Sequence, residues 1–205
     1  DAAMARSMSI VVGNPRPGSR TRTVAEAVGE ACVAAIGDVT TTVIDLADFG
    51  GRLFDPHDAE VVDLTESVAA SDLLVVASPT FKATYSGLLK CFFDRYPGPG
   101  LAGAVAVPVM MGGNPAHSLA PDVALRPLLV ELGASCPTRS LYVTDPDLDR
   151  LDDSFGLEGE TWSAAFFIDN VSNEFAPFFF SERYAQTRAT VLPPRTYGMT
   201  LRMNF

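Results

Sequence analysis

The 205-residue chain has few cysteines, no cysteine pair at close spacing and no long apolar run. Cys32, Cys91 and Cys136 lie far apart, so the sequence favours reduced core thiols over a disulfide framework or a thiolate metal site. No apolar run approaches the roughly 18 residues of a membrane span. The short segment before Arg6 lacks the apolar core of a secretion signal. We therefore expect a cytoplasmic protein that does not bind a membrane.

Basic residues are also scarce, because 15 Lys and Arg stand against 25 Asp and Glu, for a net charge of −10. Nucleic acids and anionic membranes bind through basic surfaces, so neither is an expected partner. An acidic segment contains Asp145, Asp147, Asp149, Asp152 and Asp153. It lacks the glycine and the closing glutamate of a calcium loop, and we interpret it as a solvated turn with no metal.

Neither the Walker A pattern nor the dinucleotide fingerprint is present, yet the stretch Gly13-Asn-Pro-Arg-Pro-Gly-Ser-Arg-Thr21 resembles an anion site in composition. It follows the apolar run 8–12 and precedes a helical pattern over 23–36. Helix N-termini carry unpaired N–H groups and a partial positive charge. Two arginines and two hydroxyls in the turn add donors suited to a terminal phosphate. The alternative is an ordinary strand–helix turn with solvated arginines.

Apolar segments and helical patterns alternate along the first 150 residues. The expected strands are 8–12, 39–46, 72–77, 104–110 and 140–143, and the expected helices are 23–36, 60–70, 87–94 and 120–132. This order predicts an α/β domain with a doubly wound, five-stranded parallel sheet over residues 1–150. Residues 151–205 are rich in aromatics without a clear period. We expect an atypical C-terminal tail, which would be a final helix with an oligomerisation arm or a partly disordered end.

Three loops of unusual composition follow the first, third and fourth expected strands. In a doubly wound sheet, ligands bind beyond the carboxyl ends of the strands, where the strand order reverses. The loops 13–21, 78–85 and 111–115 therefore meet at one edge of the sheet. Their convergence predicts a binding site there.

Together these loops resemble the NADPH-dependent FMN reductases of the flavodoxin-like superfamily, especially the flavin reductases that serve two-component monooxygenases. The matching segments are Gly13 to Thr21, Ser78-Pro-Thr-Phe-Lys-Ala-Thr-Tyr-Ser-Gly-Leu-Leu-Lys90, Gly112-Gly-Asn-Pro-Ala-His-Ser-Leu-Ala120 and Ala124-Leu-Arg-Pro-Leu-Leu129. The resemblance covers roughly residues 8–150 and implies the strand order 2-1-3-4-5.

The resemblance implies an FMN site with no catalytic side chain, because flavin and nicotinamide carry the chemistry. Its first loop would hold the phosphate, and the later loops would line the ring and ribityl chain, with NADPH or NADH stacking on the open ring face. The implied cofactor-binding residues are Asn14, Arg16, Ser19, Arg20, Thr21, Pro79, Thr80, Phe81, Lys82, Tyr85, Ser86, Met111, Gly112, Gly113 and His117.

Several of these residues have a second interpretation. His117 would cap a helix or line a subunit contact, Lys82 would be solvated, and Phe81 would belong to the core. Tyr85 would pack across a dimer interface. Two departures from the family stand out. Val123 stands at the subunit interface where the family's sulfonate-linked reductases often have an aromatic or polar residue, and the chain from about 154 does not follow the usual closing helix.

The implied function is an NAD(P)H:FMN oxidoreductase that passes hydride from nicotinamide to flavin and supplies reduced FMN to a partner monooxygenase. One alternative retains FMN and reduces quinones, azo dyes or metal oxyanions. Another is a flavodoxin-like electron carrier. The resemblance also implies a homodimer or homotetramer.

Overall fold

A computed structural model describes residues 6–150, 162–169, 177–180, 188–191 and 196–203. Five strands form one parallel sheet in the order β2-β1-β3-β4-β5, which confirms the expected order. The strands are β1 (Arg6–Val12), β2 (Val39–Asp45), β3 (Leu73–Pro79), β4 (Val105–Gly112) and β5 (Leu141–Thr144). The order reverses between β1 and β3, which is the topological switch point of a doubly wound sheet.

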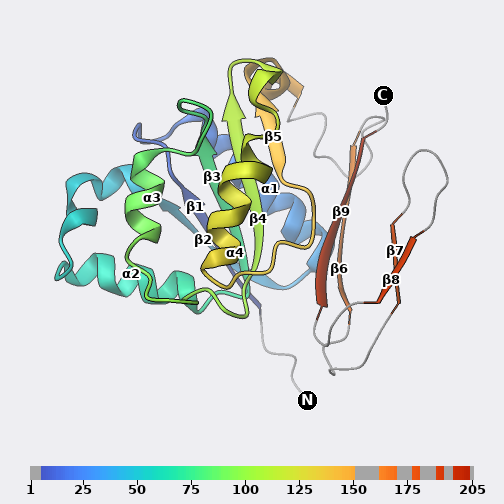
Figure 1. Ribbon diagram of the computed structural model, residues 1–205, viewed down its shortest axis with the longest axis horizontal. Helices are drawn as coiled ribbons and strands as arrows, with labels where there is room; N and C mark the ends of the chain where they lie inside the picture. Colours follow the sequence, from blue (N-terminus) through green and yellow to red (C-terminus); the bar gives the residue numbers. More distant parts are fainter. Residues whose placement is uncertain (1–5, 151–161, 170–176, 181–187, 192–195, 204–205) are drawn as a thin grey trace.

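Helices cover both faces of this sheet (Figure 1). They are α1 (Arg20–Ile36), α2 (Ala59–Ala69), α3 (Gly87–Phe93) and α4 (Arg126–Glu131). The strands are apolar on both sides, and successive residues enter opposite layers because side chains alternate across a strand. In β1, Val12 faces the layer under α1, whereas Val11 faces the layer under α2, α3 and α4.

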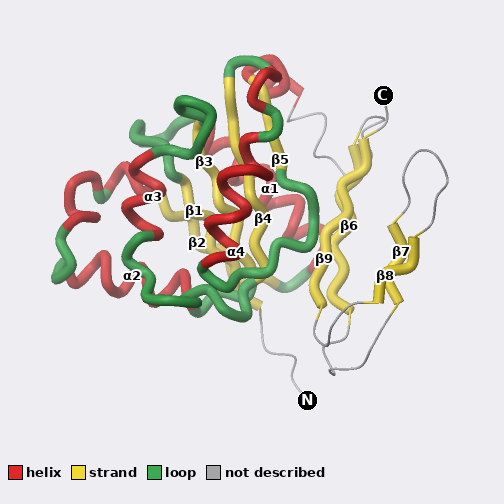
Figure 2. Tube along the Cα trace, in the orientation of Figure 1, coloured by secondary structure: helices red, strands yellow, loops and turns green. Residues whose placement is uncertain are grey.

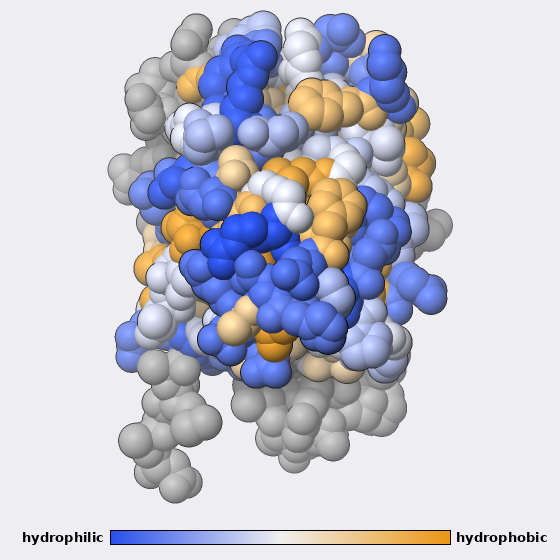
Figure 3. All heavy atoms as spheres, turned by 90° about the vertical axis from the view of Figure 1, so that its left-hand side faces the viewer, coloured by the Kyte–Doolittle hydropathy of each residue, from blue (hydrophilic) through white to orange (hydrophobic). Residues whose placement is uncertain are grey.

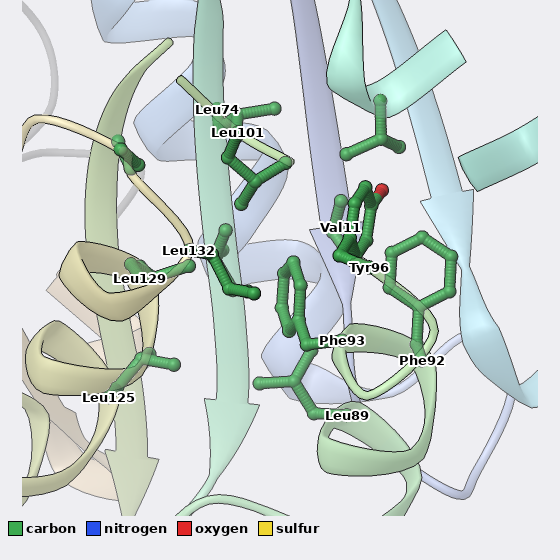
Figure 4. Close-up of a cluster of buried hydrophobic side chains, with 14 of the residues drawn as sticks. Val11, Leu74, Leu89, Phe92, Phe93, Tyr96, Leu101, Leu125, Leu129 and Leu132 are labelled. Atoms are coloured by element: carbon green, nitrogen blue, oxygen red, sulfur yellow. The ribbon is translucent and has the colours of Figure 1, made fainter. Parts of the chain in front are cut away.

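Aromatic side chains of α3 fill the centre of the second layer. The rings of Phe92 and Phe93 meet edge to face with centroids 5.3 Å apart, and Tyr96 lies 5.8 Å from Phe92. Figure 4 shows Phe93 beside Leu132, and the same buried cluster includes strand residues such as Leu74 and α4 residues such as Leu129. Each fully buried side chain of this size stabilises the fold by roughly 1.5–3 kcal/mol. The layer thus anchors α3, whose N-terminus lies at the candidate site.

Two helices differ by more than one residue from the sequence-based bounds. The first begins at Arg20 rather than residue 23, because Ser19 is its N-cap and accepts a hydrogen bond from the Arg22 N–H. The expected helix 120–132 opens with a π-turn, Pro121–Leu125, before α4. Pro127 has no N–H to donate to the carbonyl four residues earlier. The wider π-turn before it therefore sacrifices no hydrogen bond from residue 127.

The loop 47–58 also contains structure that the sequence did not predict. Two 3-10 helices, Leu46–Asp48 and Gly50–Phe54, occupy most of it. Arg52 joins this segment to the start of α2 through Asp58 at 2.8 Å and Glu60 at 2.7 Å. Figure 3 shows the side of the molecule on which α2 and α3 lie, where hydrophobic residues form separate patches among hydrophilic ones.

In the tail, the described segments are strands. β6 (Trp162–Asp169) pairs with β9 (Thr196–Met203), and β7 (Pro177–Phe180) pairs with β8 (Arg188–Val191), both antiparallel. β6 lies beside α1. Asp152 and Asp153 of the acidic segment fall outside the described residues. Among the described residues, no helix is long and apolar enough to cross a bilayer.

Candidate functional site

The three loops predicted from the sequence lie at the same end of the sheet, beyond the carboxyl ends of β1, β3 and β4 (Figure 2). Two backbone hydrogen bonds extend the sheet into them. The Gly13 N–H donates to the Ala77 carbonyl at 2.7 Å, and the Thr80 N–H donates to the Met111 carbonyl at 2.7 Å. The first residues of the three loops are therefore held in register across the switch point.

The loop after β1 is built as a tight turn that leads into α1. The Asn14 side chain accepts from the Arg16 N–H at 3.0 Å and donates to the Thr21 hydroxyl at 2.9 Å. Gly18 has a φ of +60°, a conformation that glycine adopts without strain. Arg20 and Thr21, in the first turn of α1, carry N–H groups that have no acceptor within the helix. The turn thus presents backbone donors and a positive dipole end.

The basic side chains of this turn differ in their partners. Arg22 bonds Glu26 at 2.8 Å, which raises the pKa of its guanidinium, and it lies 3.8 Å from Asp45. Arg20 pairs with Asp145 at 3.1 Å. Arg16 is exposed, and among the described residues it has no ion-pair partner. Arg16 is thus the cation of this turn that is free to meet an incoming anion.

Asp45 is a component of the site that sequence reasoning missed. It ends β2, its residue is 4% exposed, and its carboxylate accepts from the Gly18 N–H at 3.1 Å and the Ala47 N–H at 3.3 Å. It therefore braces the middle of the first loop from the neighbouring strand. A carboxylate at the carboxyl end of a strand beside the switch point was the available signal.

The second loop contains a strained two-residue turn. The N–H of Phe81 donates to the Thr84 carbonyl at 2.8 Å, and the return bond measures 3.2 Å. Between them, Lys82 (φ +53°) and Ala83 (φ +65°) both adopt the left-handed conformation, which is uncommon for residues with a Cβ. Phe81 is 48% exposed, so its alternative interpretation as a core residue is wrong.

Ser86 is buried beneath the site. Its hydroxyl donates to the Gly13 carbonyl and accepts from the Leu89 N–H at 3.0 Å, which makes it the N-cap of α3. Its own N–H donates to the Ser78 hydroxyl at 2.9 Å. Ser86 thus joins the first two loops to α3, through its hydroxyl and its own N–H. Tyr85, beside it, packs partly buried against the core.

Thr80 contributes an orphaned polar atom. Its hydroxyl oxygen is buried and has no hydrogen-bond partner among the described residues. A buried hydroxyl without a partner is costly, by about 1–3 kcal/mol, unless a ligand or water completes it. Pro79, the last residue of β3, is buried as well. This edge of the site therefore has an unmet hydrogen-bonding group.

The third loop begins at the end of β4, where Met111 is buried, Gly112 is partly exposed and Gly113 is exposed. Asn114 caps the 3-10 helix Pro115–His117 by accepting from the Ala116 N–H at 2.9 Å. His117 is the last residue of that helix and is exposed, so Asn114 rather than His117 is the cap. Within the described residues, no cluster of three or more His, Cys, Asp or Glu side chains is arranged to hold a metal.

A parallel sheet of order 2-1-3-4-5 with polar loops gathered at its carboxyl edge defines a flavodoxin-like protein. The family model of the NADPH-dependent FMN reductases matches residues 7–146. The chain belongs to that family.

Known relatives agree in fold and family. An FMN reductase (NADPH) from Escherichia coli is 42% identical over 81 residues, which are 40% of this chain and 42% of that protein. An NADH-dependent FMN reductase from Pseudomonas putida is 29% identical over 69% of this chain and 78% of that protein. The crystal structure of an apo NADH:FMN oxidoreductase matches with a TM-score of 0.63 and 32% identity, covering 72% of this chain and 84% of that one. The chain spans less than half the length of the first curated relatives it matches.

Proposed function

We propose that this chain is an NAD(P)H-dependent FMN reductase whose flavin site lies in residues 1–150 at the edge formed by the three loops. The observation that carries the proposal is the first loop, where Arg16, without an ion-pair partner in the described part of the chain, precedes the N-terminus of α1 at the switch point. The family match over residues 7–146 supports it. The tail, residues 151–205, is proposed as a separate extension.

The phosphate of FMN would bind at the first loop. The N–H groups at the start of α1 and the guanidinium of Arg16 supply charge-assisted donors. Ser19 accepts from the Arg22 N–H, and its own hydroxyl hydrogen stays available to a phosphate oxygen. Thr21 is buried and bonded to Asn14, so these two residues would shape the loop under the phosphate. Arg20 would also contact the phosphate once its ion pair with Asp145 is broken.

The ring and ribityl chain would lie along the second and third loops. The orphaned hydroxyl of Thr80 fits a polar ligand, because such a partner would satisfy it. Gly112 and Gly113 would let backbone approach the ring's polar edge, with Pro79 and Met111 behind it. Phe81 and Tyr85 would border the ring. Ser86 would position these loops, and Lys82 and His117 would stand at the rim, open to the nicotinamide cofactor.

Bound FMN supplies the acceptor for hydride from a nicotinamide, and the reaction needs no protein acid or base. The residues of this chain would hold and orient the two cofactors, which lowers the entropic part of the barrier. Both NADPH and NADH remain candidates, since relatives of each preference match this chain. The proposal therefore assigns no residue to the 2′-phosphate.

The proposed partners are a second copy of the chain and a flavin-dependent monooxygenase that consumes reduced FMN. Exposed apolar side chains beside α4 support a homodimer or homotetramer: Leu119 is 69% exposed, Val123 67% and Val130 53%. Burial of these side chains against another copy would remove them from water. Three free cysteines support a reducing compartment such as the cytoplasm.

The direct test is turnover of the purified chain with each nicotinamide and with FMN, FAD, riboflavin or menadione. We expect added FMN to accelerate NAD(P)H oxidation to saturation. Absence of acceleration by any flavin would contradict the proposal. A yellow protein that turns over only with quinone would identify the FMN-retaining reductase instead. A yellow protein inert towards both nicotinamides would identify the electron carrier.

A further inference from the structure

The two exposed arginines of the first loop are not equivalent. Arg16 has no ion-pair partner among the described residues, whereas the guanidinium of Arg20 lies 3.1 Å from the Asp145 carboxylate. Arg20 is the first residue of α1, and Asp145 directly follows β5. Both therefore stand at the sheet edge that carries the proposed phosphate site. The Asp145 carboxylate therefore already pairs with Arg20, a cation that the phosphate would use.

This ion pair is accessible and exchangeable. The Arg20 side chain is 67% exposed and the Asp145 side chain 38%. Exposed pairs of this kind contribute only about 0–1 kcal/mol, so a stronger anion can displace the carboxylate. A phosphate monoester carries a charge of about −1.5 to −2 at neutral pH. The phosphate would replace Asp145 as the partner of Arg20, but the displaced carboxylate would remain close to the phosphate.

We propose that Asp145 is an affinity-determining residue that competes with the FMN phosphate for Arg20 and so weakens retention of the flavin. This inference rests on the proposed function. Two effects act in the same direction: the Arg20 contact with Asp145 must be broken before phosphate binds, and like charges then repel across the site. A flavin held less tightly leaves more readily, which suits a reductase that releases reduced FMN as product.

The chain offers a matched control on the same turn. Asp147 lies two residues after Asp145, and its carboxylate accepts from the Thr144 N–H at 2.9 Å. No salt bridge from Asp147 is present among the described residues. The variants Asp145→Asn and Asp147→Asn remove the same charge from the same segment. Only the first removes a carboxylate from Arg20.

The experiment measures FMN and riboflavin affinity by equilibrium titration and FMN release by stopped flow, using the full chain. We expect Asp145→Asn to bind FMN roughly two- to fivefold more tightly and to release it more slowly. The riboflavin affinity of Asp145→Asn should equal that of wild type. The Asp147→Asn variant should bind both flavins as tightly as wild type does. Arg20→Gln should weaken FMN binding, and Asp145→Asn should gain less in the Arg20→Gln background than in wild type, because only the repulsion between the carboxylate and the phosphate is then relieved.

Three results would overturn the inference: unchanged or weaker FMN binding by Asp145→Asn, an equal gain for riboflavin, or a gain that is undiminished in the Arg20→Gln background. A wild-type protein that binds neither flavin would overturn the proposed function and this inference together. If wild type binds FMN and Asp145→Asn binds it with the same affinity, this inference alone would be overturned.

Discussion

The Tyr142 hydroxyl fills the space in which Gly112 would carry a side chain, because a Cβ on Gly112 would come within 2.0 Å of the Tyr142 oxygen. The same hydroxyl donates to the Asn114 carbonyl at 3.0 Å. β5 thus fixes the loop that follows β4 through one tyrosine. Any side chain at Gly112 would have to displace the Tyr142 ring, so the protein's own packing as well as the proposed approach to a flavin favours glycine here.

Gly112→Ala should displace Tyr142 and disturb the third loop. We expect the free energy of unfolding to fall by about 1–3 kcal/mol, as for other overpacked positions, and FMN binding to weaken. Urea unfolding and an FMN titration measure the two effects. Gly113→Ala is the control, because no heavy atom lies within 4 Å of its added Cβ. Equal stability and affinity for both variants would refute this role of Tyr142.

Ser86→Ala should destabilise the fold more than its small size suggests. It removes the N-cap of α3 and leaves the buried Gly13 carbonyl without its donor. Together these losses should lower the free energy of unfolding by about 1–3 kcal/mol. Ser118→Ala, at an exposed serine, should change it by less than about 0.5 kcal/mol. Chemical denaturation of the two variants measures the difference. Similar denaturation midpoints would contradict the role of Ser86 in linking the first loop to α3.

Ala83→Gly should stabilise the protein, because it relieves a left-handed residue in the turn of the second loop. The expected gain is up to about 1 kcal/mol, since the strain of a Cβ in this conformation is roughly 1–2 kcal/mol and glycine loses more entropy on folding. Ala34→Gly, on an exposed position of α1, should have the opposite sign at about 1 kcal/mol. Thermal unfolding of both variants provides the measurement. A loss of stability in Ala83→Gly would show that the turn is unstrained.

Much of the fold was predictable because it depends on local patterns. Continuous apolar runs such as 73–77 predict buried parallel strands, and the alternation with helices leaves few topologies. The site edge was predictable from that topology, because the three unusual loops follow strands whose carboxyl ends meet at one edge of the sheet. The strand order agreed with the resemblance to a known family.

What the sequence did not reveal depends on contacts between distant residues. The pairing of Arg20 with Asp145 joins positions 125 residues apart, and no periodicity reports it. The same holds for Asp45 under Gly18 and for Tyr142 over Gly112. The positive φ of Lys82 and Ala83 was hidden because neither residue type favours it. These contacts and backbone conformations are set by tertiary packing, which local sequence preferences do not report.

Alkaline pH should destabilise the protein through Cys32. Burial raises the pKa of this thiol from 9.0 to about 12. The unfolded thiol therefore loses its proton first, and the stabilisation present below about pH 9 is lost as the pH rises towards 12. The slope should not exceed about 1.4 kcal/mol per pH unit from this group. Urea unfolding from pH 8 to 10.5 should show a shallower decline for Cys32→Ala than for wild type, and parallel curves would contradict this assignment.

The central claim is that the first loop binds the phosphate of FMN, and comparison of FMN with riboflavin tests it most directly. Affinities for both flavins are measured by fluorescence titration for wild type, Arg16→Ala and the control Lys90→Ala, which removes a cation paired with Asp94 on α3. We predict that Arg16→Ala weakens FMN binding by about 1.5–3 kcal/mol, or roughly ten- to hundredfold, and leaves riboflavin and the control unchanged. Equal losses for the two flavins, or a wild-type protein that ignores FMN, would contradict the account.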